Sequence, residues 1–121
     1  MDKKPNVIYH GSSKKIIGET INPSQGDDSD ERPDNKLFGV YAADRKDFAI
    51  VMGIFSCKDV IGGSIDGFTK NTIDAKIYGK LPKQKYIYLY TLPSKTFNPS
   101  KIIKHQFVSK VPVKPIKTER I

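Results

Sequence analysis

The chain has 121 residues, enough for one folded domain and too few for two of ordinary size. It carries 21 Lys and Arg against 13 Asp and Glu, a net charge of +8, and its single cysteine, Cys57, excludes an internal disulfide or a zinc site built from several cysteines. No apolar run is long enough to cross a bilayer and no secretion signal follows Met1, so we expect one cytoplasmic domain over residues 1–121 with no membrane partner.

The positive charge is concentrated in the second half of the chain. Residues 1–60 hold 9 Lys and Arg and 10 Asp and Glu, a net charge of −1, whereas residues 61–121 hold 12 and 3, a net charge of +9. A basic half is typical of proteins that bind nucleic acid or another polyanion. Only 3 of the 21 cations are arginine, the residue best suited to bidentate phosphate recognition, so a solvated lysine-rich surface is the better interpretation.

The first predicted elements are two strands separated by a loop. β-forming residues from Asn6 to His10 predict a strand, closed by a turn at Gly11-Ser12. Residues 22–36 contain two prolines and a net-negative cluster without any aliphatic or aromatic residue, which predicts an exposed, acidic and mobile loop. Strand composition returns from Leu37 to Ala42.

The next segment has the only strong helix pattern in the sequence. Apolar residues recur at the spacing of one helix face from Phe48 to Phe55, and Asp44 is placed to cap the start. We expect a helix from about Arg45 to Ser56. Cys57 follows its apolar end and is expected to be a buried, unreactive thiol.

Beyond Val60 the sequence predicts extended segments. A turn at Gly62-Gly63 is expected within the stretch from Ile61 to Phe68. Further strands are expected over Ile73–Tyr78, Lys85–Leu92, Gln106–Ser109 and Val111–Lys117. Within the second of these ranges, alternate residues form one aromatic face, made of Tyr86, Tyr88 and Tyr90. The sum is an α+β domain of mainly antiparallel strands with one main helix against the sheet.

Two short segments contain residues suited to binding chemistry. His10 ends a strand beside Gly11, where an imidazole can hydrogen-bond a ligand hydroxyl and a glycine allows close backbone approach. Tyr41 lies in the segment F-G-V-Y-A-A-D between a strand and a helix, where its ring can stack on a planar ligand. Taken one at a time, a structural histidine and a core tyrosine are the more common interpretations.

Taken together, these segments resemble the ADP-ribosyltransferase superfamily, in particular its diphtheria-toxin and poly-ADP-ribose-polymerase branch. There an H-G-[ST] motif on the first strand, here His10-Gly11-Ser12, is followed by a glycine- and tyrosine-containing strand that leads into a helix, here around Tyr41. The segment from Gln106 to Pro115 is similar to the end of small bacterial and phage proteins of this kind. The resemblance implies a split β-sheet of ADP-ribosyltransferase-like fold, with a cleft for NAD⁺ between its halves.

The resemblance also implies roles for individual residues, with NAD⁺ as the substrate. His10 would bind the ribose on the nicotinamide side, Gly11 and Ser12 the carboxamide, and Tyr41 would stack on the nicotinamide ring. The family's catalytic glutamate is matched by Gln106, which cannot offset the positive charge that develops as the glycosidic bond breaks. The catalytic positions would thus belong either to a mono-ADP-ribosyltransferase, with a protein or nucleic acid as acceptor, or to a catalytically weakened relative.

A second class of function is a binding module without enzymatic activity, such as a phage or mobile-element effector. Its aromatic strand face could stack on nucleobases while the lysines of the second half contact phosphates or a protein. This interpretation needs the three tyrosines exposed. A nucleotide enzyme instead needs His10, Tyr41 and Gln106 around one pocket.

Overall fold

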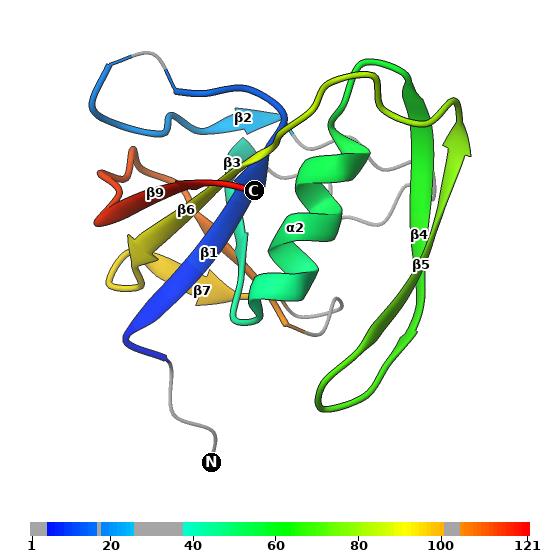
Figure 1. Ribbon diagram of the computed structural model, residues 1–121. Helices are drawn as coiled ribbons and strands as arrows, with labels where there is room; N and C mark the ends of the chain where they lie inside the picture. Colours follow the sequence, from blue (N-terminus) through cyan, green and yellow to red (C-terminus); the bar gives the residue numbers. More distant parts are fainter. Residues whose placement is uncertain (1–4, 17, 26–37, 101–104) are drawn as a thin grey trace.

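A short helix lies between two β-sheets in the computed structural model (Figure 1). The structure describes residues 5–16, 18–25, 38–100 and 105–121. In chain order the elements are β1 (Val7–Ser12), β2 (Ser24–Gln25), β3 (Phe38–Ala43), α2 (Lys46–Phe55), β4 (Val60–Phe68), β5 (Ile73–Gly79), β6 (Tyr88–Pro93), β7 (Phe97–Pro99), β8 (Gln106–Ser109) and β9 (Lys117–Arg120). All pairings between these strands are antiparallel.

The larger sheet has seven strands. Its order is β7-β8-β3-β1-β6-β9, with β2 paired to β3 beside this path, whereas β4 and β5 form a separate two-stranded sheet. β1 pairs with β6 along its whole length, from Val7 opposite Pro93 to Ser12 opposite Tyr88. Between β1 and β3 the register has a single pair, Tyr9 opposite Ala43. The halves of the larger sheet therefore meet at a narrow junction.

Each face of the larger sheet has its own apolar core. Alternate residues of β1 point to opposite sides, so Tyr9 packs against the core that contains Leu89, on what we call the helix face, whereas Ile8 lies on the opposite face. The opposite-face core includes Ile8, Val40, Ala42, Tyr90, Leu92, Phe97 and Phe107. The helix-face core consists of Ala43, Phe48, Ala49 and Leu89. The larger core therefore lies on the side away from α2.

The helix α2 forms where the apolar spacing predicted it, one residue shorter at each end. The predicted cap was wrong, because Arg45 is the N-cap residue, with no side-chain cap hydrogen bond, and Asp44 pairs with His105 instead. Within the first turn, the Asp47 carboxylate accepts a hydrogen bond from the backbone N–H of Phe48 at 2.7 Å. No helix in the described part of the chain has the length and apolar character needed to cross a membrane.

Two glycines allow α2 to approach β1 closely. A Cβ atom placed on Gly11 would lie 1.9 Å from the carbonyl oxygen of Ala49, and one placed on Gly53 would lie 3.1 Å from the backbone nitrogen of Ser12. The turn predicted at Gly11-Ser12 was wrong, since β1 continues through both residues. Glycine is needed at position 11 because any side chain would enter the helix backbone.

The turn predicted at Gly62-Gly63 was also wrong. β4 is one strand of 9 residues, with shifts of register between Val60 and Gly62 and between Ile65 and Gly67. A Cβ atom on Gly63 would lie 2.3 Å from the ring of Phe55, so this glycine makes room for the last residue of α2. The hairpin β4–β5 can therefore lie along the side of the helix away from β1 (Figure 1).

The fold is mostly β, and the expected α+β class was wrong. Among the described residues 47% lie in strands and 10% in the single short helix. Glycine-punctuated segments such as Val60–Phe68 resemble loops in composition, but they extend as strands once a neighbouring strand supplies hydrogen bonds and packing. The resemblance also predicted an ADP-ribosyltransferase-like fold. That prediction is not supported either, because it was part of the same α+β expectation. Of the predicted acidic loop, residues 26–36 lie outside the described residues, and residues 22–25 include β2.

The aromatic strand faces the core rather than solvent. Tyr90 on β6 is fully buried, and Tyr88 packs against the opposite-face core. Tyr86, just before the strand, is 41% exposed, and the Arg120 guanidinium lies 4.3 Å from its ring centroid. The three tyrosines therefore form no continuous exposed face on which nucleobases could stack.

Candidate functional site

His10 lies at the junction between β1 and β3. Its Nδ1 donates a hydrogen bond to the backbone carbonyl oxygen of Tyr41 at 2.5 Å. The centroid of its ring is 6.0 Å from that of Tyr90, with 39° between the ring planes. Because the backbone register joins these strands at one pair, the imidazole supplies an additional link between the halves of the sheet.

The protonation state of His10 follows from its surroundings. Desolvation lowers the pKa of the imidazole below its ordinary value, while the hydrogen bond to Tyr41 opposes that shift less strongly. The ring is therefore neutral at pH 7, and its proton lies on Nδ1 because a carbonyl oxygen can only accept. Nε2 is left as an acceptor without a partner among the described residues, and the residue is partly exposed. It can thus receive a hydrogen bond from a ligand hydroxyl.

Of the other motif residues on β1, Ser12 shares a face with His10 and Gly11 does not. Residues two positions apart on a strand point to the same side. The hydroxyl of Ser12 accepts a hydrogen bond from the backbone N–H of Lys14 at 3.1 Å, and the residue is partly exposed. Gly11 points to the helix face, where the Ala49 carbonyl occupies the adjoining space. A ligand therefore has no room beside Gly11 on that face.

Tyr41 and Gln106 lie together on the helix face. In the pairing of β3 with β8, Ala43 is opposite Gln106 and Tyr41 is opposite Val108. Ala43 belongs to the helix-face core, so Tyr41, two positions away, and Gln106, directly across, point to the same side. Gln106 is buried, with 4% of its surface exposed.

The predicted site residues therefore do not surround one pocket. His10, Tyr41 and Gln106 occupy three adjacent strands, and the first two share a hydrogen bond. The sheet nevertheless lies between the imidazole and the other two side chains, because successive residues of a strand alternate sides. His10 and Ser12 therefore lie on one face of the sheet, and Tyr41 and Gln106 lie on the other.

A histidine–carboxylate pair that sequence reasoning missed lies at the start of α2. His105 Nδ1 is 2.7 Å from Oδ1 of Asp44, and the Asp44 backbone N–H donates to the His105 carbonyl oxygen at 3.1 Å. The rings of Phe48 and Phe68 have centroids 6.5 and 4.9 Å from that of His105. Its φ of 70° is the one positive value among the described non-glycine residues. The partners are 61 positions apart, so no local spacing signals the pair.

Cys57 is buried, and the described acidic residues form no metal-binding cluster. Cys57 is 3% exposed, and burial, with a smaller contribution from the charge of Asp59, raises the pKa of its thiol. The predicted burial of the cysteine is confirmed, and the raised pKa disfavours the reactive thiolate form. Within the ranges that the structure describes, no three His, Cys, Asp or Glu side chains are placed to hold a metal ion.

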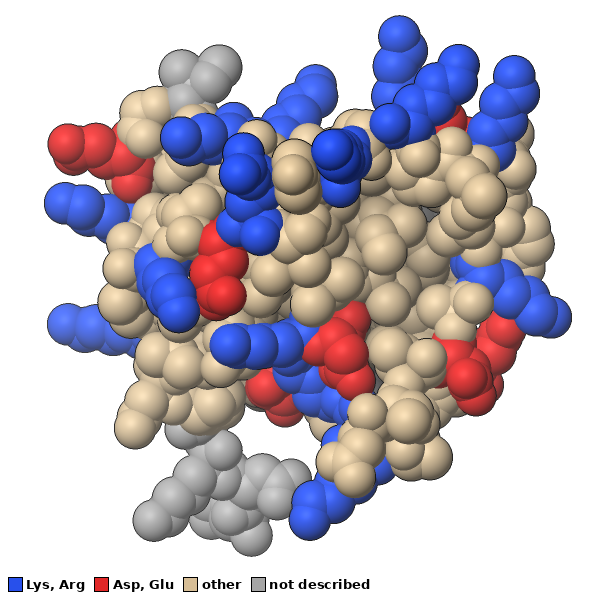
Figure 2. Space-filling model, viewed as in Figure 1, with Lys and Arg blue, Asp and Glu red and all other residues tan. Residues whose placement is uncertain are grey.

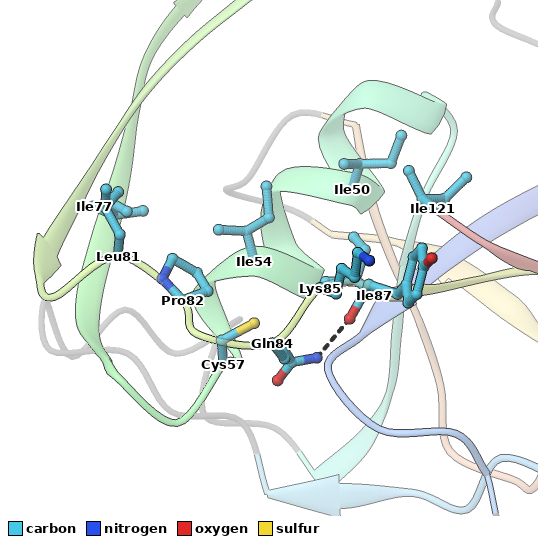
Figure 3. Close-up of a pocket in the computed structure, with 11 residues that line it drawn as sticks. Ile50, Ile54, Cys57, Ile77, Leu81, Pro82, Gln84, Lys85, Ile87 and Ile121 are labelled. Atoms are coloured by element: carbon cyan, nitrogen blue, oxygen red, sulfur yellow. Dashed lines mark hydrogen bonds between the residues drawn. The ribbon is translucent and has the colours of Figure 1, made fainter.

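A cavity of about 500 Å³ that none of the predicted site residues lines lies beside α2 (Figure 3). Its walls come from α2, from β5 and from the segment that leads into β6, and they are mainly aliphatic. The aliphatic lining residues include Ile50, Ile54, Ile77, Leu81, Ile87 and Ile121. Sequence reasoning missed this hollow because its residues come from four separate parts of the chain.

Comparison with known proteins gives no match: no family model, curated protein or solved structure is significantly similar to the chain. The resemblance to ADP-ribosyltransferases therefore rests on the motif residues alone. What these residues do has to be inferred from their geometry.

Proposed function

We propose that the protein binds a nucleotide of the NAD⁺ type through His10, with Ser12 contributing on the same face of β1. The observation that carries this proposal is the fixed imidazole, whose Nδ1 donates to the Tyr41 carbonyl and whose Nε2 has no described partner. Because burial keeps the ring neutral, Nε2 is an acceptor suited to a ribose hydroxyl. The nucleotide class comes from the resemblance of the H-G-S motif.

The proposal concerns binding rather than turnover. Cleavage of the N-glycosidic bond of NAD⁺ passes through a positively charged transition state, which a neighbouring carboxylate stabilises. Gln106 is neutral, and it lies across the sheet from the His10 ring. We therefore expect no more than residual NAD⁺ cleavage. A cytoplasmic location belongs to the same proposal, because NAD⁺ is available there and a free thiol such as Cys57 stays reduced.

Calorimetric titration of the full chain with NAD⁺ and with ADP-ribose at neutral pH tests this proposal. We expect saturable binding, and about tenfold weaker affinity for NAD⁺ in His10→Ala, which corresponds to the loss of one well-oriented hydrogen bond. Asn71→Ala is the control, since Asn71 is exposed in the turn between β4 and β5, which belong to the separate two-stranded sheet. Its affinity should be unchanged. Equal affinities of the wild type and His10→Ala, or no binding by the wild type, would exclude His10 as a nucleotide ligand.

A further inference from the structure

The cavity beside α2 is an apolar groove that leaves aliphatic side chains open to solvent. Ile50 and Ile54 contribute from the helix, and Figure 3 shows Ile77 and Leu81 to one side of Ile54 and Ile121 to the other. Leu81 is 77% exposed and Ile121 is 46% exposed. Aliphatic surface gathered around one hollow is typical of a binding surface, whereas single exposed apolar residues are not.

Lysines without an ion-pair partner among the described residues lie in or next to the segments that line this apolar groove. Lys85 lines it, Lys80 and Lys83 belong to the same segment, and Lys58 follows the end of α2. All four are exposed, and none has an ion-pair partner in the described part of the chain. The carboxylate of Asp59, which follows Lys58, accepts a hydrogen bond from the backbone N–H of Lys83 at 3.3 Å. In the view of Figure 2, which is that of Figure 1, Lys and Arg side chains gather along the upper edge of the molecule, above uncharged surface.

Arg120 adds a further positive charge next to Tyr86, the aromatic residue that lines the groove. Tyr86 lines the groove, and the guanidinium of Arg120 lies 4.3 Å from its ring centroid. A guanidinium stacked on a ring keeps its N–H donors free at its edge, where they can bind a carboxylate. Positive charge therefore borders the groove both from the lysine-rich segment and from β9.

We propose that the apolar groove docks an acidic amphipathic segment of a partner protein. Aliphatic side chains of that segment would cover Ile54, Leu81 and Ile121, and its carboxylates would pair with the bordering lysines and with Arg120. A peptide suits this surface better than a nucleic acid, because the lining is aliphatic and the ring of Tyr86 is already stacked. The proposal does not depend on nucleotide binding, since the residues proposed for the nucleotide face the other side of the sheet.

Fluorescence anisotropy with labelled synthetic peptides and the full chain tests the proposal. The first probe is a peptide long enough for about four helical turns, with leucine at helical spacing and glutamate at the positions between, so that it forms an acidic amphipathic helix. The second has the same composition with leucine at every second position, so that it forms an acidic amphipathic strand. A scrambled sequence accompanies each probe. We expect one of the patterned peptides to bind saturably, at least about fivefold more tightly than its scramble, with affinity that falls as salt is added. NAD⁺ should not displace it.

Substitutions in the protein then locate the binding surface. Leu81→Ser and the double variant Lys83→Gln/Lys85→Gln should each weaken the patterned peptide about fivefold. The matched controls, at exposed apolar and basic positions that do not line the groove, are Val111→Ser and Lys110→Gln/Lys114→Gln. They should change the affinity by less than about twofold. All the altered side chains are exposed, so circular dichroism should show every variant to be folded.

Several results would overturn the proposal. One is the absence of saturable binding by all patterned peptides, and another is equal binding by the scrambled peptides. A third is an oligonucleotide that displaces the peptide and binds the wild type and Leu81→Ser alike, which would indicate a general polyanion surface. A fourth is sedimentation that shows a dimer for the wild type and a monomer for Leu81→Ser, because a second copy would then cover the groove. Loss of NAD⁺ binding would leave each of these measurements unaffected.

Discussion

The two faces of the larger sheet differ in how completely they are covered. The opposite face has the larger core, in which Ile8, Leu92 and Phe97 are fully buried. The helix face is covered by a helix of 10 residues and a two-stranded hairpin, which leave a hollow of about 500 Å³ beside Ile54. The short covering layer on the helix face therefore leaves apolar surface available to a partner.

The same comparison separates the residues of one motif. His10 and Ser12 belong to the opposite face, at the edge of its core, and the imidazole retains an acceptor with no partner among the described residues. Gly11, between them, belongs to the helix face, where its lack of a side chain allows α2 to pack. The three adjacent residues of the H-G-S motif, which the sequence assigned to one binding site, therefore lie on two different faces of the sheet.

The largest effect is expected on the helix face. Gly11→Ala should lower the free energy of unfolding by about 3 kcal/mol, because its methyl group would meet the Ala49 carbonyl oxygen at 1.9 Å and force α2 away from β1. Urea denaturation measures this change. Gly67→Ala is the matched control, since a Cβ atom there has no neighbour within 4 Å, and its effect should stay within about 0.5 kcal/mol. Similar stabilities of the two variants would contradict the tight packing of α2 on β1.

The next largest effect concerns Gln106. Gln106→Glu should lower the free energy of unfolding by about 2 kcal/mol at neutral pH, because it places a carboxylate at a position that is 4% exposed. The loss should shrink as acid neutralises the carboxylate. Release of nicotinamide from NAD⁺ should not rise, since this side chain and His10 lie on different faces. A clear gain in nicotinamide release would indicate that both side chains act at one site, which would contradict their placement on different faces of the sheet.

The smallest effect is a pH dependence on the opposite face. The pKa of His10 is lowered in the folded protein, so below the ordinary histidine pKa of about 6.5 the unfolded chain binds a proton that the folded chain does not. The stability that depends on neutral His10 is therefore complete above that pH and is lost as the pH falls toward the lowered pKa. Urea denaturation at about pH 7.5 and about pH 5.5 should show a larger loss for the wild type than for His10→Gln. Equal losses would indicate that His10 is not desolvated.

Features that depend on neighbouring residues could be predicted from the sequence. The apolar spacing from Phe48 to Phe55 predicted α2 within one residue at each end, and the strand Gln106–Ser109 has the predicted bounds. The burial of Cys57 was predicted from its place after an apolar helix. These features follow from periodicity and composition over a few residues, because local backbone preference and one-sided burial are enough to produce them.

Features that depend on register and packing were decided in the folded chain. The faces to which His10, Tyr41 and Gln106 point follow from strand alternation and from which strands pair. The Asp44–His105 pair and the apolar groove join residues far apart in sequence. Gly11 and Gly63 were predicted to lie in turns, but in the structure each makes room for α2. Such contacts have no local signal, since the partner that gives each residue its role is brought to it only when the chain folds.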